Sequence, residues 1–266
     1  MSASSGTGSG VSASSTGSAS TRSSTGTSTA AGESPVTLIT GGASGIGAAT
    51  VGRLLAAGHR VAVTGRDQAR LDDFAATLGA GPDALFPVAA DTTDFAAVRA
   101  AVDATVKEFG RLDGVIANAG FSTHDNLADG DPDQWREMLL VNVLGPAVLI
   151  KAALPALTRS GGRIVLIGST AGIKNTPGNM YSVSKTALTS LAENARVLVT
   201  GSGVGVTLIA PGRVDTPFWG SHPAGTIPSG PTLTAEHIAD AVVWALGQPA
   251  GVEVNSVVVR PSGQAH

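Results

Sequence analysis

Three side chains in the second half of the chain have the types and spacing needed for proton transfer. Tyr181 is the only tyrosine among 266 residues; Lys185 follows it by four positions and Ser169 precedes it by twelve. Positions i and i+4 share one face of a helix, so the phenol and the ammonium would be neighbours. A phenol has a pKa near ~10, and a nearby ammonium favours phenolate and lowers that pKa. The trio therefore indicates acid–base chemistry at Tyr181, with Ser169 holding a substrate carbonyl opposite it.

The elements that would position this trio alternate between apolar runs and segments with helical spacing. We expect strands at 36–40, 60–65, 84–91, 112–120 (including a turn), 162–170, 204–212 and 254–261. We expect helices at 48–58, 70–79, 94–110, 133–157, 181–199 and 235–248. Strands that are apolar along their whole length are typical of a parallel sheet covered on both faces. The sequence therefore predicts an α/β fold, a single-domain Rossmann fold with a doubly wound, seven-stranded parallel sheet and helices on both faces.

Composition separates the first 34 residues from the rest. They are nearly all Ser, Thr, Gly and Ala, so they cannot bury enough apolar surface to offset the entropy of ordering. We expect residues 1–34 to be a disordered tail, or alternatively an address signal, and residues 35–266 to form the domain.

The bulk properties exclude several classes of function. The net charge is −3, without a basic run, which argues against nucleic acid and anionic membranes as partners. The chain has no cysteine, which excludes disulfides and thiolate zinc sites, and the five histidines are scattered, so we expect no metal. A small-molecule substrate and a cytoplasmic location are the remaining expectations.

A glycine-rich segment, TGGASGIG, joins the first expected strand to the first expected helix. Residues without a Cβ let backbone amides approach a pyrophosphate, and the helix offers its positive N-terminus. Such glycines can also serve only a tight turn, but the strand–loop–helix context favours a bound dinucleotide. The expected cofactor contacts in this segment are Gly41, Ser44, Gly45, Ile46 and Gly47.

The end of the second strand indicates which dinucleotide is bound. NAD enzymes of this architecture tend to have an acidic residue there, whereas this chain has Gly65 followed by Arg66. A guanidinium suits a 2′-phosphate, so we predict NADP(H) rather than NAD(H). The alternative is that Arg66 is a loop charge paired with Asp67. After the third strand, Asp91, next to Thr92, either accepts from the adenine amino group or caps the following helix.

These segments resemble the short-chain dehydrogenase/reductase family. TGGASGIG, NAG, LLVNVLG, GSTAG, YSVSK and PGRVDT occur in the order and spacing of that family over about residues 35–266. The resemblance implies a tetrad of Asn142, Ser169, Tyr181 and Lys185. Tyr181 would be the general acid/base, Ser169 would orient the substrate oxygen, and Lys185 would lower the tyrosine pKa and bind the nicotinamide ribose. Asn142 would hold a water that links Lys185 to solvent, or else be a buried polar residue at a helix kink.

The small residues Asn118, Ala119 and Gly120 would lie next to the bound ribose, or alternatively form only a tight turn. The resemblance also implies cofactor contacts next to the nicotinamide, at Pro211, Gly212, Val214 and Thr216. The chain departs from the family pattern at two places. Ala117 stands where many members have an asparagine. Ser169 and Tyr181 are twelve positions apart, whereas thirteen is frequent in the family, so Thr170 is the alternative hydroxyl. The ending VNSVVVRPSGQ resembles the branch that contains clavulanate dehydrogenase and NADP-dependent 3-hydroxy acid dehydrogenases.

Together these features predict an NADP(H)-dependent oxidoreductase that interconverts a carbonyl and an alcohol by hydride transfer. The alternatives are an NADP(H)-binding sensor or scaffold, and an epimerase or dehydratase on the same fold. We expect the substrate walls in 121–131, 172–180 and 217–232. The side chains that would line them, unless they are ordinary packing residues, are Phe121, His124, Met180, Phe218 and Trp219. The resemblance to the family implies a homodimer or homotetramer built on the helices at 133–157 and 181–199.

Overall fold

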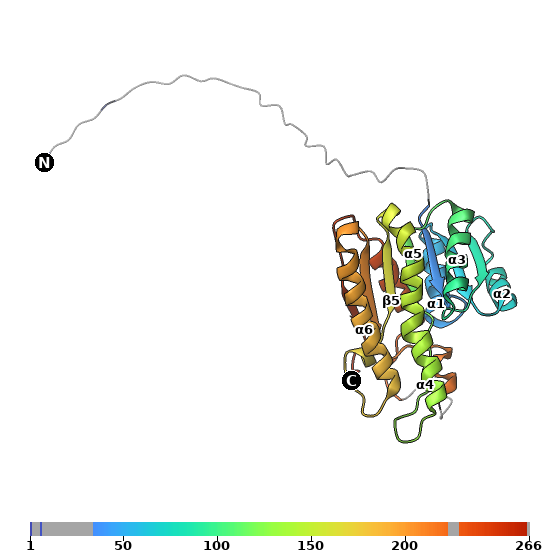
Figure 1. The fold of residues 1–266 in the computed structure, drawn as a ribbon. Helices are drawn as coiled ribbons and strands as arrows, with labels where there is room; N and C mark the ends of the chain where they lie inside the picture. Colours follow the sequence, from blue (N-terminus) through green and yellow to red (C-terminus); the bar gives the residue numbers. More distant parts are fainter. Residues whose placement is uncertain (2–5, 7–33, 223–228, 265–266) are drawn as a thin grey trace. The chain divides into compact units, whose positions relative to one another are not determined.

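The computed structural model in Figure 1 describes residues 1, 6, 34–222 and 229–264. Apart from Met1, Gly6 and Ser34, the tail expected at 1–34 lies outside the described residues. Ser34–His266 is one compact unit, and the elements below all belong to it.

Seven parallel strands form one sheet in the order β3-β2-β1-β4-β5-β6-β7. Their bounds are β1 Val36–Thr40, β2 Arg60–Gly65, β3 Leu85–Ala89, β4 Gly114–Ala117, β5 Arg163–Ile167, β6 Gly205–Pro211 and β7 Ser256–Val259. The strand order reverses between β1 and β4, and such switch points are where doubly wound sheets bind ligands. The predicted α/β architecture is therefore confirmed.

Helices cover both faces of this sheet (Figure 1). They are α1 Gly45–Ala56, α2 Gln68–Leu78, α3 Phe95–Phe109, α4 Pro132–Leu139, α5 Gly145–Ser160, α6 Met180–Val199 and α7 Ala235–Leu246, with short 3-10 turns η2 Thr170–Gly172, η3 Thr200–Ser202 and η4 Pro217–Ser221. Successive strand residues point to opposite faces, so Leu38 packs with α3, α5 and α6, whereas Ile39 packs with α1, α2 and α7. This two-sided burial explains why the strands are continuously apolar.

The helix predicted as continuous over 133–157 is interrupted by a short π-helical segment, in which the helix has a wider turn. A π-helical stretch, η1 Leu140–Leu144, separates α4 from α5, and the Gly145 amide donates to the Leu140 carbonyl. Pro146 explains part of this, because it has no N–H to donate to the carbonyl of Asn142 four residues earlier. The prediction of one uninterrupted helix was wrong at the turn that carries Asn142.

The helical run from Pro132 to Ser160 is long and apolar enough to cross a membrane. Here Leu149, Ala153 and Leu157 on this run are fully buried in the cluster that covers the sheet. The run is therefore a core helix of the domain.

Candidate active site

A cavity of about 1150 Å³ opens at the carboxyl ends of the strands. Its wall includes residues that follow each of β1 to β6. The predicted site residues on this wall are Gly41, Ser44, Gly45, Ile46, Arg66, Asp91, Thr92, Asn118, Ala119, Gly120, Ser169, Tyr181, Lys185, Pro211, Gly212, Val214 and Thr216. Gly47 and Asn142, also predicted, do not line it. The fold therefore gathers most of the predicted residues in one place.

The glycine-rich turn and the start of α1 form an anion-compatible wall. Gly41 and Gly45 have φ of +63° and +50°, a region that favours glycine. Ser44 is the N-cap of α1 but its side chain accepts no capping hydrogen bond, and the first turn of α1 holds no acidic side chain. The positive end of this helix therefore faces the cavity without a side-chain cap, and the residues present fit a dinucleotide pyrophosphate.

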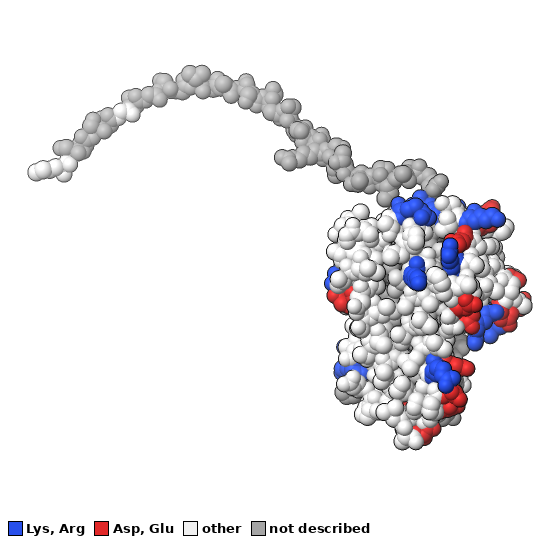
Figure 2. All heavy atoms as spheres, viewed as in Figure 1, with Lys and Arg blue, Asp and Glu red and all other residues white. Residues whose placement is uncertain are grey.

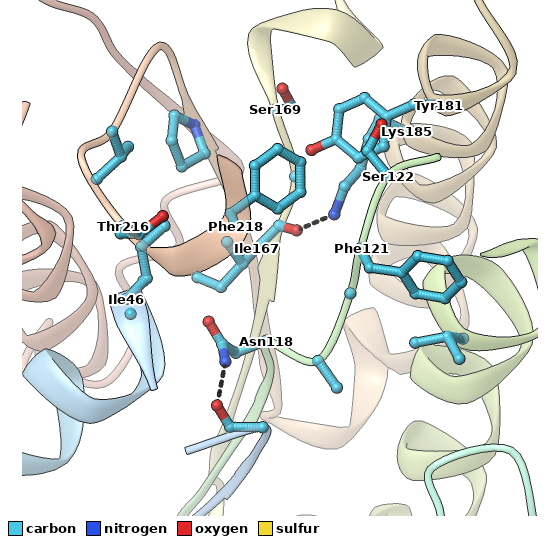
Figure 3. A pocket seen from close by; sticks show the side chains of 18 of the residues that line it. Ile46, Asn118, Phe121, Ser122, Ile167, Ser169, Tyr181, Lys185, Thr216 and Phe218 are labelled. Atoms are coloured by element: carbon cyan, nitrogen blue, oxygen red, sulfur yellow. Dashed lines mark hydrogen bonds between the residues drawn. The ribbon is translucent and has the colours of Figure 1, made fainter. Parts of the chain in front are cut away.

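Asn118 holds this turn from behind (Figure 3). Its Nδ2 donates to the carbonyl oxygens of Thr40 at 3.0 Å and Gly41 at 2.9 Å. A Cβ on Gly47 would overlap the Gly41 carbonyl and lie 2.6 Å from Asn118 Nδ2. Gly47 is therefore a close-packing position behind the glycine-rich turn.

Contacts of the charged residues after β2 and β3 bear on two alternatives from the sequence: whether Arg66 pairs with Asp67, and whether Asp91 caps α3. The Asp67 carboxylate accepts from the Arg70 amide at the start of α2, and the described residues include no ion pair of Arg66. Asp91 Oδ1 accepts from the amide and hydroxyl of Thr93, both at 2.8 Å.

These contacts correct one alternative for Asp91. Its hydrogen bonds with Thr93, and more weakly the charge of Arg66, lower the pKa of the Asp91 carboxyl. Asp94 caps α3 by accepting from the amides of Ala96 and Ala97, so the reading of Asp91 as that cap was wrong. Asp91 therefore stays on the cavity wall as a carboxylate near Arg66.

The end of β5 and the start of α6 bring the trio together (Figure 3). Asn179 caps α6, because its side chain accepts from the Ser182 amide at 2.8 Å. The Lys185 Nζ donates to the Ile167 carbonyl at 2.9 Å and lies 5.7 Å from the centroid of the Tyr181 ring. Ser169 Oγ accepts from the Ala171 amide at 3.1 Å, and Ser169 lines the same cavity as Tyr181 despite the shorter connection between them.

Burial dominates the ionisation of both titratable groups. It raises the pKa of Tyr181 to about 12, against the opposite effect of the Ser169 hydrogen bond. Burial lowers the pKa of Lys185 to about 8; this side chain is only 5% exposed. The lowered tyrosine pKa expected from the sequence is absent from this structure, and Tyr181 is a neutral phenol at pH 7.

Asn142 lies behind the cavity wall and is 1% exposed. Its Oδ1 accepts from the Phe121 amide at 3.1 Å, and its Nδ2 donates to the Phe121 carbonyl at 2.9 Å and to Ser184 Oγ at 3.0 Å. A Cβ on Gly120 would lie 3.0 Å from Asn142 Oδ1 and 3.6 Å from Lys185 Nζ. The Asn142 side chain therefore positions the segment that follows β4.

Aromatic side chains border the cavity next to the trio. Phe121, His124, Phe218 and Trp219 line it as expected, whereas Met180 does not. Sequence reasoning did not single out His222, Ile167 or Asn179. Asn179 has a recognisable N-cap signature, but the Ile167 contact is made by a backbone carbonyl and has no side-chain signal.

Comparisons with known proteins point in one direction. Residues 35–225 match the family model described as short chain dehydrogenase. The chain is 35% identical over 232 residues to an uncharacterized oxidoreductase of Staphylococcus saprophyticus, covering 86% of this chain and 98% of the relative. It is 36% identical over 255 residues to the granaticin polyketide synthase putative ketoacyl reductase 2 of Streptomyces violaceoruber, covering 90% and 98%.

Solved structures show the same fold with nicotinamide cofactors. Serine dehydrogenase complexed with NADP+ is 29% identical with a TM-score of 0.81, covering 87% of this chain and 96% of that one. The 3-ketoacyl-(acyl-carrier-protein) reductase of Brucella melitensis complexed with NADH is 26% identical with a TM-score of 0.78, covering 86% and 97%. The narrower branch resemblance of the C-terminal segment stays a prediction.

Proposed function

Because the chain belongs to the short-chain dehydrogenase family and is an oxidoreductase by that membership, we propose that it interconverts a ketone or aldehyde with an alcohol using NADP(H). The observation that carries this proposal is the meeting of three groups in one cavity. A neutral Tyr181 phenol, the Ser169 hydroxyl and the buried Lys185 ammonium stand at the wall that also contains the uncapped start of α1.

In the reductive direction Tyr181 donates its proton to the substrate oxygen. Its raised pKa keeps the phenol protonated until negative charge develops on that oxygen. The Ser169 hydroxyl donates to the same oxygen and stabilises the developing charge. A bound nicotinamide supplies or accepts the hydride at the carbonyl carbon.

Lys185 and Asn142 are proposed to return the proton to Tyr181. With a pKa of about 8, Lys185 exchanges a proton readily near neutral pH. The carbonyl of Asn142 lacks its α-helical donor because residue 146 is proline, which leaves it able to accept from a water next to Lys185. Lys185 is also proposed to bind the cofactor ribose.

Arg66 is the basis for preferring NADP(H). It lines the cavity after β2, close enough to Asp91 to affect the pKa of that carboxyl, and forms no ion pair with the neighbouring Asp67 carboxylate. A guanidinium in this position binds a 2′-phosphate through charge-assisted hydrogen bonds. Asp91 and Thr92 are proposed to border the adenine.

Substitution of Tyr181 by Phe tests the proposed reaction. We expect NADPH-dependent reduction of a carbonyl panel to fall by about 10²- to 10⁴-fold, because the general acid is lost. NADPH binding, followed by fluorescence, should change little. Undiminished turnover in Tyr181→Phe would contradict the mechanism. NADPH binding without turnover in the wild type would favour a sensor. Conversion of substrate without net NADPH consumption would favour an epimerase or dehydratase.

A cytoplasmic homodimer or homotetramer is the assembly we propose. The face over α5 and α6 shows few charged side chains (Figure 2). Exposed apolar residues on the helical run and on α6 include Leu144, Val183, Val197 and Leu198. Light scattering after size-exclusion chromatography tests the assembly, and a monomer at micromolar concentration would contradict it.

A further inference from the structure

A group of rings stands next to the proposed proton donor. The centroid of the Phe218 ring lies 5.6 Å from that of Tyr181, 5.4 Å from that of Trp219 and 5.2 Å from that of His124. Figure 3 shows the Phe218 side chain beside Tyr181, whereas Phe121 points away from this pair. We call Phe218, Trp219 and His124 the ring wall.

The ring wall is held in place by contacts between two distant loops. The His124 ring stacks on Trp219 at 5.5 Å with an interplanar angle of 28°, and its Nε2 lies 3.4 Å from the Phe218 carbonyl oxygen. The Trp219 Nε1 donates to the Val214 carbonyl at 2.8 Å. The ring wall is therefore a prepared surface, because its members are fixed by the protein before a substrate arrives.

The backbone of His124 adds to this picture. Its φ is +58°, and among the described residues it is the one non-glycine in the left-handed region. Such backbone strain persists where surrounding contacts hold it, and it clusters at ligand-binding positions. Here the strain places the imidazole against Trp219 and Phe218.

The three side chains of the ring wall are uncharged at pH 7, so they offer no ion pair to an anionic substrate. Burial is the main cause that lowers the pKa of His124, so its ring is neutral at pH 7. Lys185 donates to the Ile167 carbonyl and Arg213 donates to the Ser229 carbonyl. Arg66 lies after β2, away from β5, and Glu137 adds a carboxylate to the cavity lining.

From these observations we infer the substrate class: an uncharged carbonyl compound with an aromatic ring beside the carbonyl. The inference rests on the proposed reductase function. The substrate ring packs against Phe218, since aromatic pairs prefer offset or edge-to-face arrangements at such distances. Its carbonyl carbon accepts the hydride of NADPH, its oxygen accepts the proton of Tyr181, and the products are the aryl alcohol and NADP⁺.

Two pairs of ketones test this class by NADPH consumption. Acetophenone and cyclohexyl methyl ketone have similar size but differ in aromaticity; methyl 4-acetylbenzoate and 4-acetylbenzoate differ in charge. In Phe218→Leu, we expect the ratio of kcat/KM for acetophenone over cyclohexyl methyl ketone to fall about five- to tenfold from its wild-type value. In the wild type, we expect the ester to be preferred over the carboxylate by about tenfold.

Phe95→Leu is the matched control, because Phe95 lies on α3, does not line the catalytic cavity and has the Lys151 ammonium over its ring. It should leave the ketone ratio at the wild-type value. Should Phe218→Leu fail to fold, inhibition of the wild type by 1-phenylethanol and 1-cyclohexylethanol provides the comparison, with the phenyl alcohol expected to inhibit about fivefold more tightly.

The outcomes separate the two proposals. An unchanged ketone ratio in Phe218→Leu, equal inhibition by the two alcohols, or a preference for the carboxylate overturns the substrate class while the reductase function stands. The reductase function would be overturned if the wild type reduced none of the four ketones and if wild type and Tyr181→Phe consumed NADPH equally slowly across a wider carbonyl panel. The substrate class would then fall with it.

Discussion

The Nζ of Lys185 donates to the carbonyl oxygen of Ile167 at 2.9 Å. This bond joins the second turn of α6 to the last residue of β5. It directs a buried ammonium toward the strand end that also leads to Ser169. Lys185 is thus positioned by the contact between a helix and the sheet it covers.

Burial of this ammonium gives folding stability a specific pH dependence. The pKa of Lys185 falls from 10.5 to about 8 on folding. Between these values the unfolded chain binds more protons, so the folded state gains stability as the pH rises, by on the order of 3 kcal/mol. Lys185→Met should not show this rise in unfolding free energy with pH. Tyr181 is present in both proteins, so its titration does not account for a difference between them. Urea denaturation of the cofactor-free proteins from pH 7.5 to 10.5 measures the difference, and parallel curves would contradict it.

Asn142→Ala should destabilise the protein and lower activity. It leaves the amide and carbonyl of Phe121 without their buried partner, at a cost of about 1–3 kcal/mol each before relaxation. Ser184→Ala is the milder control, because it removes one hydrogen bond to Asn142 and leaves Phe121 held. We expect the larger loss of unfolding free energy and of kcat in Asn142→Ala. Equal effects of the two variants would show that the Phe121 contacts matter little.

Two glycines of α1 should respond oppositely to alanine. In Gly47→Ala the added Cβ overlaps the Gly41 carbonyl, so the glycine-rich turn must shift, and NADPH affinity should fall at least tenfold if this turn binds the cofactor as proposed. In Gly52→Ala the Cβ meets no atom within 4 Å, so helix propensity should raise stability by about 0.5–1 kcal/mol with affinity unchanged. NADPH titration and thermal unfolding test both variants. Similar affinities would rule out the close-packing role of Gly47.

Arg66→Ala should change cofactor preference. We expect kcat/KM for NADPH to fall about ten- to hundredfold through loss of hydrogen bonds to a charged phosphate, with the value for NADH nearly constant. Arg70→Ala, two residues into α2, is the control; its backbone amide keeps the bond to Asp67. Steady-state kinetics with both cofactors measures the effect. An NADPH preference that survives Arg66→Ala would remove the basis for the NADP(H) assignment.

Local patterns were sufficient to predict much of the fold. The apolar runs at 36–40 and 60–65 coincide with β1 and β2, and the helix expected at 94–110 is α3, capped by Asp94. These features depend on side-chain periodicity and on neighbours within one turn, which a sequence displays directly. The glycine-rich turn before α1 was visible for the same reason.

Contacts between residues far apart in the chain depend on how the elements pack together. The Rossmann architecture, the glycine turn and the close spacing of Tyr181 and Lys185 could be predicted before the structure was known. Only the folded chain placed Lys185 against Ile167, widened the helix at Asn142, and brought His124 to Phe218. It also reversed the expected direction of the Tyr181 pKa, because desolvation depends on what surrounds a phenol in space rather than on which residues are near it along the chain.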